Sequence, residues 1–182
     1  MRGDFTNSAI NVYGLLKTVA VIAIILVLIV VFVGAPLPVS GSSMQPNFHN
    51  GEIVLVLRNG LSGPIKRGEV VEARFPADPN HTKLIKRVIG LPGDTVSFDN
   101  YGYYTINGQV LAEDYGPIYG QLPAETVSNI TLGSGEYFLS GDNRPGSSDS
   151  RIWGPVQASD IQGRVALIIW PLNMLGLANP NY

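Results

Sequence analysis

The chain has 182 residues, which allows one ordinary domain with a small additional element but not two full domains. Only 14% of residues are charged, the formal net charge is −2 and 45% are hydrophobic, so the composition excludes a disordered chain and offers no global positive field for nucleic acid. The absence of cysteine excludes disulfide bonds, thiolate metal sites and cysteine nucleophiles.

The first element is a continuous apolar segment near the N-terminus. Residues 18–35 carry no charge, and residues 19–33 are apolar without interruption. A helix of about 18–20 residues is about 27–30 Å long, the thickness of the hydrocarbon core of a bilayer. Pro36 and Pro38 would end this helix. A cleaved secretory signal is the alternative, but its apolar core is usually about 7–15 residues long and ends in a small-x-small site.

These features predict three regions along the chain. Residues 1–17 are expected to be a short cytoplasmic N-terminus, residues 18–37 a transmembrane anchor, and residues 38–182 an extracytoplasmic domain. The orientation follows from Arg2 and Lys17, which precede the apolar segment, because positive charge favours the cytoplasmic side. We therefore expect a single-pass protein of the cell membrane.

The region after the anchor is predicted to be mostly β. Short apolar runs alternate with turn residues, and no amphipathic helix of 10–15 residues separates them, which argues against a parallel α/β sheet. Asn107-Gly108 predicts a two-residue hairpin. We expect an antiparallel domain with two packed or partly closed, barrel-like sheets, and a surface excursion over residues 113–135. The expected strands cover residues 53–57, 70–75, 84–89, 95–98, 103–106, 110–111, 137–139 and 164–169.

Three polar segments could carry chemistry, although each has a purely structural explanation. Residues 40–46 (SGSSMQP) hold serines on a glycine-flanked turn, a composition also typical of linkers. Residues 83–94 place Lys86 and Arg87 in an apolar strand, where they could be edge charges or a desolvated lysine. Residues 141–151 (GDNRPGSSDSR) could be a solvated turn or a hydrogen-bonded support.

Taken together and in this order, the segments resemble the sequence boxes of the type I signal peptidases, the membrane-anchored Ser/Lys endopeptidases that cut signal sequences from exported proteins. Ser43-Met44-Gln45-Pro46 is similar to the nucleophile box, and residues 86–94 (KRVIGLPGD) are similar to the general-base box. Residues 67–76 resemble the strand box between them, and residues 141–154 resemble the last box. A single span resembles the shorter enzymes common in Gram-positive bacteria.

The resemblance implies roles for individual residues. Ser43 would be the nucleophile, Lys86 the general base, and the backbone N–H of Ser43 an oxyanion donor. Five further residues are expected to support this pair. Ser147 would orient the Lys86 amine, and Asp149 and Arg151 would pair to hold the loop. Asp142 and Arg87 are the other two expected supporting residues. The chain departs from the family pattern in three places. Gly41 stands where one branch has an oxyanion-stabilising serine, Asn47 stands where threonine is frequent, and Pro145-Gly146 stands before Ser147 where the family often has more polar residues.

The proposed base sets an energetic requirement. Lys86 can accept a proton only if its pKa falls from about 10.4 to about 8, which corresponds to about 3.3 kcal/mol, and apolar burial can supply this. His49 and His81 lie in polar turns and are expected at the surface. No metal ion or other cofactor is expected, because the chain has two scattered histidines, no cysteine and no phosphate-binding loop.

The resemblance implies a membrane-anchored serine endopeptidase that cleaves signal peptides after small residues, at sites of the Ala-x-Ala type, through an acyl-enzyme. Its expected partners are secretory preproteins and the lipid bilayer, not nucleic acid, and the protein is expected to be monomeric. Two alternatives remain open from the sequence. One is a self-cleaving Ser/Lys protease, and the other is a non-catalytic membrane-anchored β module, in which Ser43 and Lys86 would be replaceable.

Overall fold

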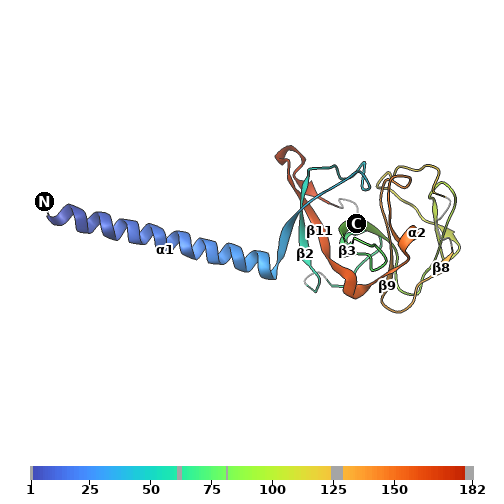
Figure 1. The fold of residues 1–182 in the computed structure, drawn as a ribbon, viewed down its shortest axis with the longest axis horizontal. Coiled ribbons are helices and arrows are strands. Elements are labelled where there is room, and N and C mark those ends of the chain that lie inside the picture. Colours follow the sequence, from blue (N-terminus) through green and yellow to red (C-terminus); the bar gives the residue numbers. More distant parts are fainter. Residues whose placement is uncertain (1, 61–62, 81, 124–128, 179–182) are drawn as a thin grey trace. The chain divides into compact units, whose positions relative to one another are not determined.

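The computed structural model describes residues 2–60, 63–80, 82–123 and 129–178 (Figure 1). The chain divides into two compact units, Met1–Ala35 and Pro36–Tyr182.

The N-terminal unit is a helix, α1 (Arg2–Phe32), whose side chains from Val12 to Leu28 are exposed. Among the described residues, no helix is both long enough and apolar enough to cross a membrane. The transmembrane anchor expected over residues 18–37 is therefore not confirmed. The helix ends at Phe32, before the two prolines, and Gly34–Pro38 form strand β1. Pro36 lacks a backbone N–H and cannot continue a helix, whereas an edge strand accepts it.

The second unit is mostly β, as predicted. Among the described residues, one sheet has eight strands in the order β1-β2-β11-β3-β4-β9-β10, with β12 also paired to β11, and a second sheet has the order β7-β6-β5-β8 (Figure 1). The strand pairs with a described register are antiparallel. The large sheet consists of β1, β2 (Ile53–Arg58), β3 (Val70–Arg74), β4 (Lys83–Gly90), β9 (Glu136–Ser140), β10 (Val156–Gln157), β11 (Ile161–Trp170) and β12 (Gly176–Leu177).

The small sheet is built around the predicted hairpin. It consists of β5 (Thr95–Phe98), β6 (Tyr104–Ile106), β7 (Gln109–Val110) and β8 (Ile130–Thr131). Asn107 and Gly108 have φ angles of 51° and 82°, as a two-residue turn between antiparallel strands requires. Of the short elements that the sequence did not indicate, β8, β10 and β12 have two residues each and α2 (Ser150–Trp153) has four, too few for a periodic pattern.

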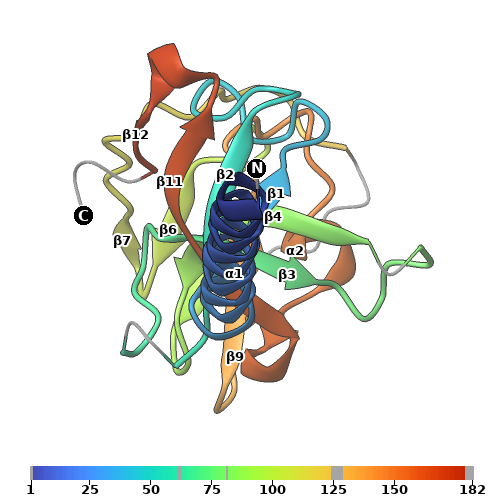
Figure 2. The same ribbon diagram turned by 90° about the vertical axis from the view of Figure 1, so that its left-hand side faces the viewer.

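The large sheet is curved (Figure 2). Strand β11 pairs with β2 through two register shifts, between Val165 and Leu167 and between Ile168 and Trp170. Such irregularities bend a strand and increase its local twist. One buried cluster of the β unit contains Met44, Phe48 and Ile85. It therefore packs the turn after β1 against β4.

Candidate active site

The turn that carries Ser43 is fixed by buried apolar side chains and by its backbone. Met44 and Phe48 are only 2% and 1% exposed. The backbone N–H of Val39 donates to the Glu52 carbonyl at 2.8 Å, which pairs the start of the turn with its end. Gly41 has a φ of 85°, a conformation that favours glycine, and its N–H donates to the Asn50 side chain at 3.0 Å. Ser43 therefore lies on an ordered turn.

Lys86 reaches this turn from the middle of β4. Its Nζ donates a hydrogen bond to the Ser43 hydroxyl at 2.7 Å, and the residue is 1% exposed. Burial lowers the pKa of Lys86 from 10.5 to about 8, because desolvation disfavours the ammonium ion. The charges of Asp149 and Asp142 partly oppose this effect, and the charge of Arg151 adds to it. The structure brings a hydroxyl and a poorly solvated amine into contact.

The loop after β9 places an ion pair behind Lys86. Arg151 donates to both carboxylate oxygens of Asp149, from Nε at 2.8 Å and from Nη2 at 2.7 Å. Asp149 also caps α2 by accepting from the Arg151 N–H, and it accepts from the Gly141 N–H at 2.9 Å. Burial is the largest influence on the pKa of Asp149 and would raise it. The hydrogen bonds and charge of Arg151, the charge of Lys86 and the Gly141 N–H together outweigh burial and hold this pKa below its usual value. Asp149 is therefore a buried anion near Lys86.

Ser147 lies at this ion pair rather than on the amine that it was expected to orient. Its hydroxyl donates to Asp149 at 2.7 Å. Within the described residues, the Lys86 amine donates its hydrogen bond to the Ser43 hydroxyl and not to Ser147. Asp149 accepts from several donors at once, and the Ser147 hydroxyl is one of them.

Gly141 allows this loop and the turn that carries Ser43 to touch. A Cβ atom at Gly141 would lie 2.3 Å from the Ser147 hydroxyl and 2.4 Å from the Ser43 carbonyl oxygen. Next to it, the Asn143 N–H donates to the Ser43 carbonyl at 3.0 Å, and the Asn143 side chain donates to the Ser42 carbonyl at 3.2 Å. The loop thus fixes the backbone on both sides of the Ser43 amide.

Arg87 and Asp142 form a second buried ion pair beside the first. Arg87 donates from Nε to one carboxylate oxygen at 2.8 Å and from Nη2 to the other at 2.7 Å. The two side chains are 2% and 0% exposed. A bidentate pair of this kind fixes the orientation of both groups, and it ties the base strand to the loop.

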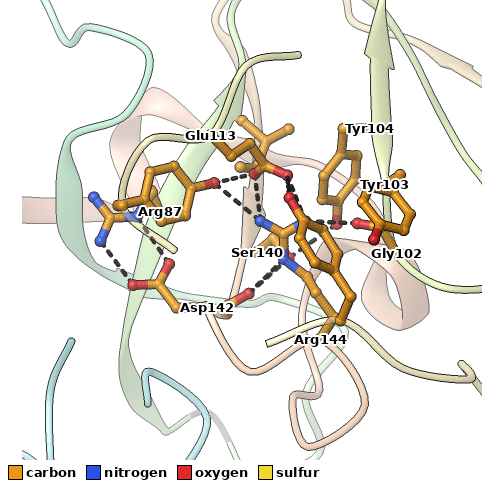
Figure 3. A network of polar contacts seen from close by, with 12 residues as sticks. Arg87, Gly102, Tyr103, Tyr104, Glu113, Ser140, Asp142 and Arg144 are labelled. Atoms are coloured by element: carbon orange, nitrogen blue, oxygen red, sulfur yellow. Dashed lines mark hydrogen bonds and ion pairs between the residues drawn. The ribbon is translucent and has the colours of Figure 1, made fainter. Parts of the chain in front are cut away.

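The segment over residues 113–119 differs from the surface excursion that the sequence predicted. The Glu113 side chain is 2% exposed and pairs with the buried Arg144 (Figure 3). Tyr115 packs on Arg87. Asn47 also contacts this segment. Sequence reasoning missed these contacts because their partners lie about 30 or more residues away. One feature of the sequence could have indicated them: Glu113 lies close to Tyr115 and Tyr119, and a carboxylate that is buried among aromatic rings requires a partner.

A small cavity adjoins the nucleophile. It has a volume of about 50 Å³, and its apolar lining includes Leu37, Val39, Met44 and Ile85, next to Ser43. His49 lies elsewhere on the turn, with Nδ1 3.2 Å from Glu52, and His81 lies outside the described residues. Within the described part of the chain, no group of three His, Asp or Glu side chains gathers that could hold a metal ion.

Comparison with known families decides the class of this site. Residues 12–170 match the family described as signal peptidase, peptidase S26. The chain belongs to this family. It is 30% identical to signal peptidase I of Bacillus licheniformis over 177 residues. This alignment covers 92% of this chain and 94% of the relative. It is 33% identical over 172 residues to signal peptidase IB of Staphylococcus aureus strain Mu50, over 86% of this chain and 88% of the relative.

A crystal structure of a signal peptidase I from Enterococcus faecalis V583 matches with 32% sequence identity and a TM-score of 0.45, over 57% of this chain and 97% of the other. The sequence-based resemblance to type I signal peptidases is confirmed by the family match. The family consists of serine endopeptidases, so the chain is an enzyme of that class. This excludes the non-catalytic module as its general class.

Proposed function

We propose that this enzyme cleaves signal peptides with Ser43 as nucleophile and Lys86 as general base. The observation that carries the proposal is the 2.7 Å hydrogen bond between the Lys86 amine and the Ser43 hydroxyl. A serine hydroxyl attacks a carbonyl only when a neighbouring base removes its proton. A lysine with a pKa of about 8 is partly neutral near neutral pH and can do so.

The reaction follows from these positions. Neutral Lys86 takes the Ser43 proton as Oγ attacks the scissile carbonyl, and the oxyanion of the tetrahedral intermediate accepts from the Ser43 N–H. Within the described residues, no group accepts a hydrogen bond from that N–H. The Lys86 ammonium then protonates the leaving amine, and an acyl-enzyme remains. Water, deprotonated by Lys86, hydrolyses the ester and regenerates Ser43. Asp149 stabilises the transient ammonium ion.

The substrate is proposed to bind as an added strand. Strand β3 pairs with β4 over Lys83–Arg87, but β9 pairs with β4 only from Arg87 onward. In the described part of the chain, the second edge of Lys83–Ile85 therefore has no partner strand. An extended peptide can pair with such an edge. Its residues at positions −1 and −3 would face the same side, because side chains alternate along a strand.

The size of the cavity supports a preference for small residues. The cavity of about 50 Å³ beside Ser43 is small and has a largely apolar lining, so it favours a short apolar side chain such as that of alanine. We therefore propose cleavage at sites of the Ala-x-Ala type.

The deciding experiment incubates the purified full chain and its Ser43→Ala variant with a preprotein that ends its signal in Ala-x-Ala. We expect cleavage after the second alanine by the parent and none by the variant, since loss of such a nucleophile costs up to about 10⁶ in turnover. A matched control is Ser134→Ala, an exposed serine in the turn before β9. Cleavage by Ser43→Ala at the parental rate would refute the assignment of the nucleophile.

We also propose, on the sequence alone, that residues 18–37 anchor a monomeric enzyme in the cell membrane with its catalytic unit outside. The support is the uninterrupted apolar run over residues 19–33. Ser43 is the eighth residue after Ala35, so an extended tether reaches at most about 26–29 Å and would keep the nucleophile near the bilayer. Alkaline extraction of membranes tests this. Release of the full chain with peripheral proteins would contradict the anchor.

A further inference from the structure

Asn47 joins three parts of the active site. It lies four residues after Ser43 in the same turn, and its side-chain amide Nδ2 donates two hydrogen bonds. One goes to the backbone carbonyl of Tyr115 at 3.0 Å, and the other goes to Asp142 Oδ2 at 2.9 Å. Asp142 is the partner of Arg87, the residue next to Lys86. A single side chain therefore links the turn of the nucleophile to the strand of the base.

Tyr115 covers the other side of the same ion pair. The Arg87 guanidinium carbon lies 4.0 Å from the centre of the Tyr115 ring, a cation–π contact. The Tyr115 hydroxyl donates to Glu113 and accepts from Arg144 Nη2 at 2.9 Å. Burial raises the pKa of Tyr115, so its hydroxyl stays protonated over the working range of pH. Tyr115 thus shields the Arg87–Asp142 pair from water.

The segment that carries Tyr115 is itself held in place. Glu113 forms a buried pair with Arg144 (Figure 3). It also accepts from the Tyr119 hydroxyl at 2.8 Å. The Ile118 N–H donates to the Asp142 carbonyl at 2.9 Å, and the Arg144 N–H donates to the Ile118 carbonyl at 2.9 Å. Residues 113–119 therefore form a rigid strap against the loop after β9.

We propose that Asn47 and Tyr115 are positioning residues that hold the Ser43 turn against the Lys86 strand. The inference rests on the function proposed above. Neither residue lines the cavity beside Ser43. Their effect is geometric: without the two hydrogen bonds of Asn47, the turn can move relative to β4, and the Nζ–Oγ contact lengthens. A misplacement of about 1 Å can cost about 10²-fold in rate.

The first test compares Asn47→Ala with the parent on one preprotein. We expect kcat to fall about 10-fold to 100-fold while KM stays within about two-fold, because the contact with substrate is unchanged. Asn47→Thr keeps one hydroxyl donor and should recover part of kcat. Asn100→Ala is the matched control, since Asn100 is exposed and only its backbone carbonyl makes a described contact, with the Leu122 N–H.

The pH profile separates positioning from electrostatics. Asn47→Ala leaves the charges of Asp142 and Arg87 in place, so the acid limb of kcat/KM should keep its midpoint while the plateau falls. Tyr115→Leu, which removes the ring over Arg87, should act in the same way, and Tyr115→Phe, which keeps that ring, should lose less. Rates are measured at a temperature well below the thermal unfolding midpoint of every variant, so that a loss of stability does not lower the folded fraction.

The outcomes are distinct. A parent that does not cleave the preprotein would overturn the proposed function, and this inference with it. A parent that cleaves and a folded Asn47→Ala variant with parental kcat would overturn the inference alone. A loss confined to KM would also overturn it, because that result would place Asn47 in substrate binding.

Discussion

The Nζ atom of Lys86 lies 2.7 Å from the Oγ atom of Ser43, although 43 residues separate the two in the sequence. Two different pieces of backbone create this contact. Ser43 sits on a turn held by Met44 and Phe48, and Lys86 projects from the centre of β4, paired with Val71 on β3. Strand β4 is held by β3 and β9, which pair with it on its two sides, whereas the turn is not part of a strand. The contact therefore depends on the interactions that hold the turn in place.

The pH dependence of kcat/KM should follow the titration of Lys86. The amine is a base only when neutral, so activity should rise with pH through about 8 and be low where the ammonium form dominates. Lys86→Arg keeps the charge but cannot lose its proton, and it should be inactive at every pH. His49→Ala, outside the site, should keep the parental profile. A midpoint near about 6.5, the usual value for histidine, would contradict the assignment.

The same pKa predicts a pH-dependent stability. Lys86 titrates near 8 in the folded enzyme and at 10.5 when unfolded, so below about 8 the folded state must bury an ammonium ion that water solvates in the unfolded state. The unfolded state binds more protons between these values, so folding becomes more favourable as pH rises through this window.

Lys86→Met removes this penalty. At pH 7 we expect the variant to be more stable than the parent by up to about 3 kcal/mol, and the difference should shrink as pH approaches 10. Denaturant unfolding at several pH values measures it, with Ser43→Ala as the control that keeps the lysine. A constant difference between Lys86→Met and the parent across this range would show that the amine is not desolvated.

Sequence reasoning found the strands and singled out Ser43 and Lys86, which the structure brings into contact, but not what holds these two residues in place. Alternating apolar runs bounded by turns are local signals, and β2 to β7, β9 and β11 lie where such runs occur. Ser43 and Lys86 were found through short motifs. The contacts of Asn47 with Tyr115 and of Glu113 with Arg144 join distant segments, and no local pattern encodes them. The same holds for Ser147, whose donation to Asp149 depends on where α2 begins.

Gly141→Ala should impair catalysis more than stability alone explains. The added methyl group would lie 2.4 Å from the Ser43 carbonyl oxygen, a backbone atom that can yield only if the nucleophile turn moves. We expect kcat to fall by about 10²-fold with a smaller change in KM, together with a lower unfolding midpoint. Gly176→Ala is the matched control, because its nearest contact would be at 3.8 Å and its φ is not positive. Equal kcat in both variants would contradict the close approach of loop and turn.

Specificity for small residues should be position-dependent along the substrate. The cavity of about 50 Å³ beside Ser43 is small and favours a short apolar side chain, so phenylalanine at position −1 should stop cleavage, and at position −3 it should strongly reduce it. Phenylalanine at position −2 provides the internal control, since in an extended peptide that side chain points to the opposite face. The measurement is kcat/KM for a peptide series that differs only at these positions. If the −1 and −2 substitutions have the same effect, the substrate is not bound as a strand beside β4; if neither reduces cleavage, the cavity does not select the residue before the scissile bond.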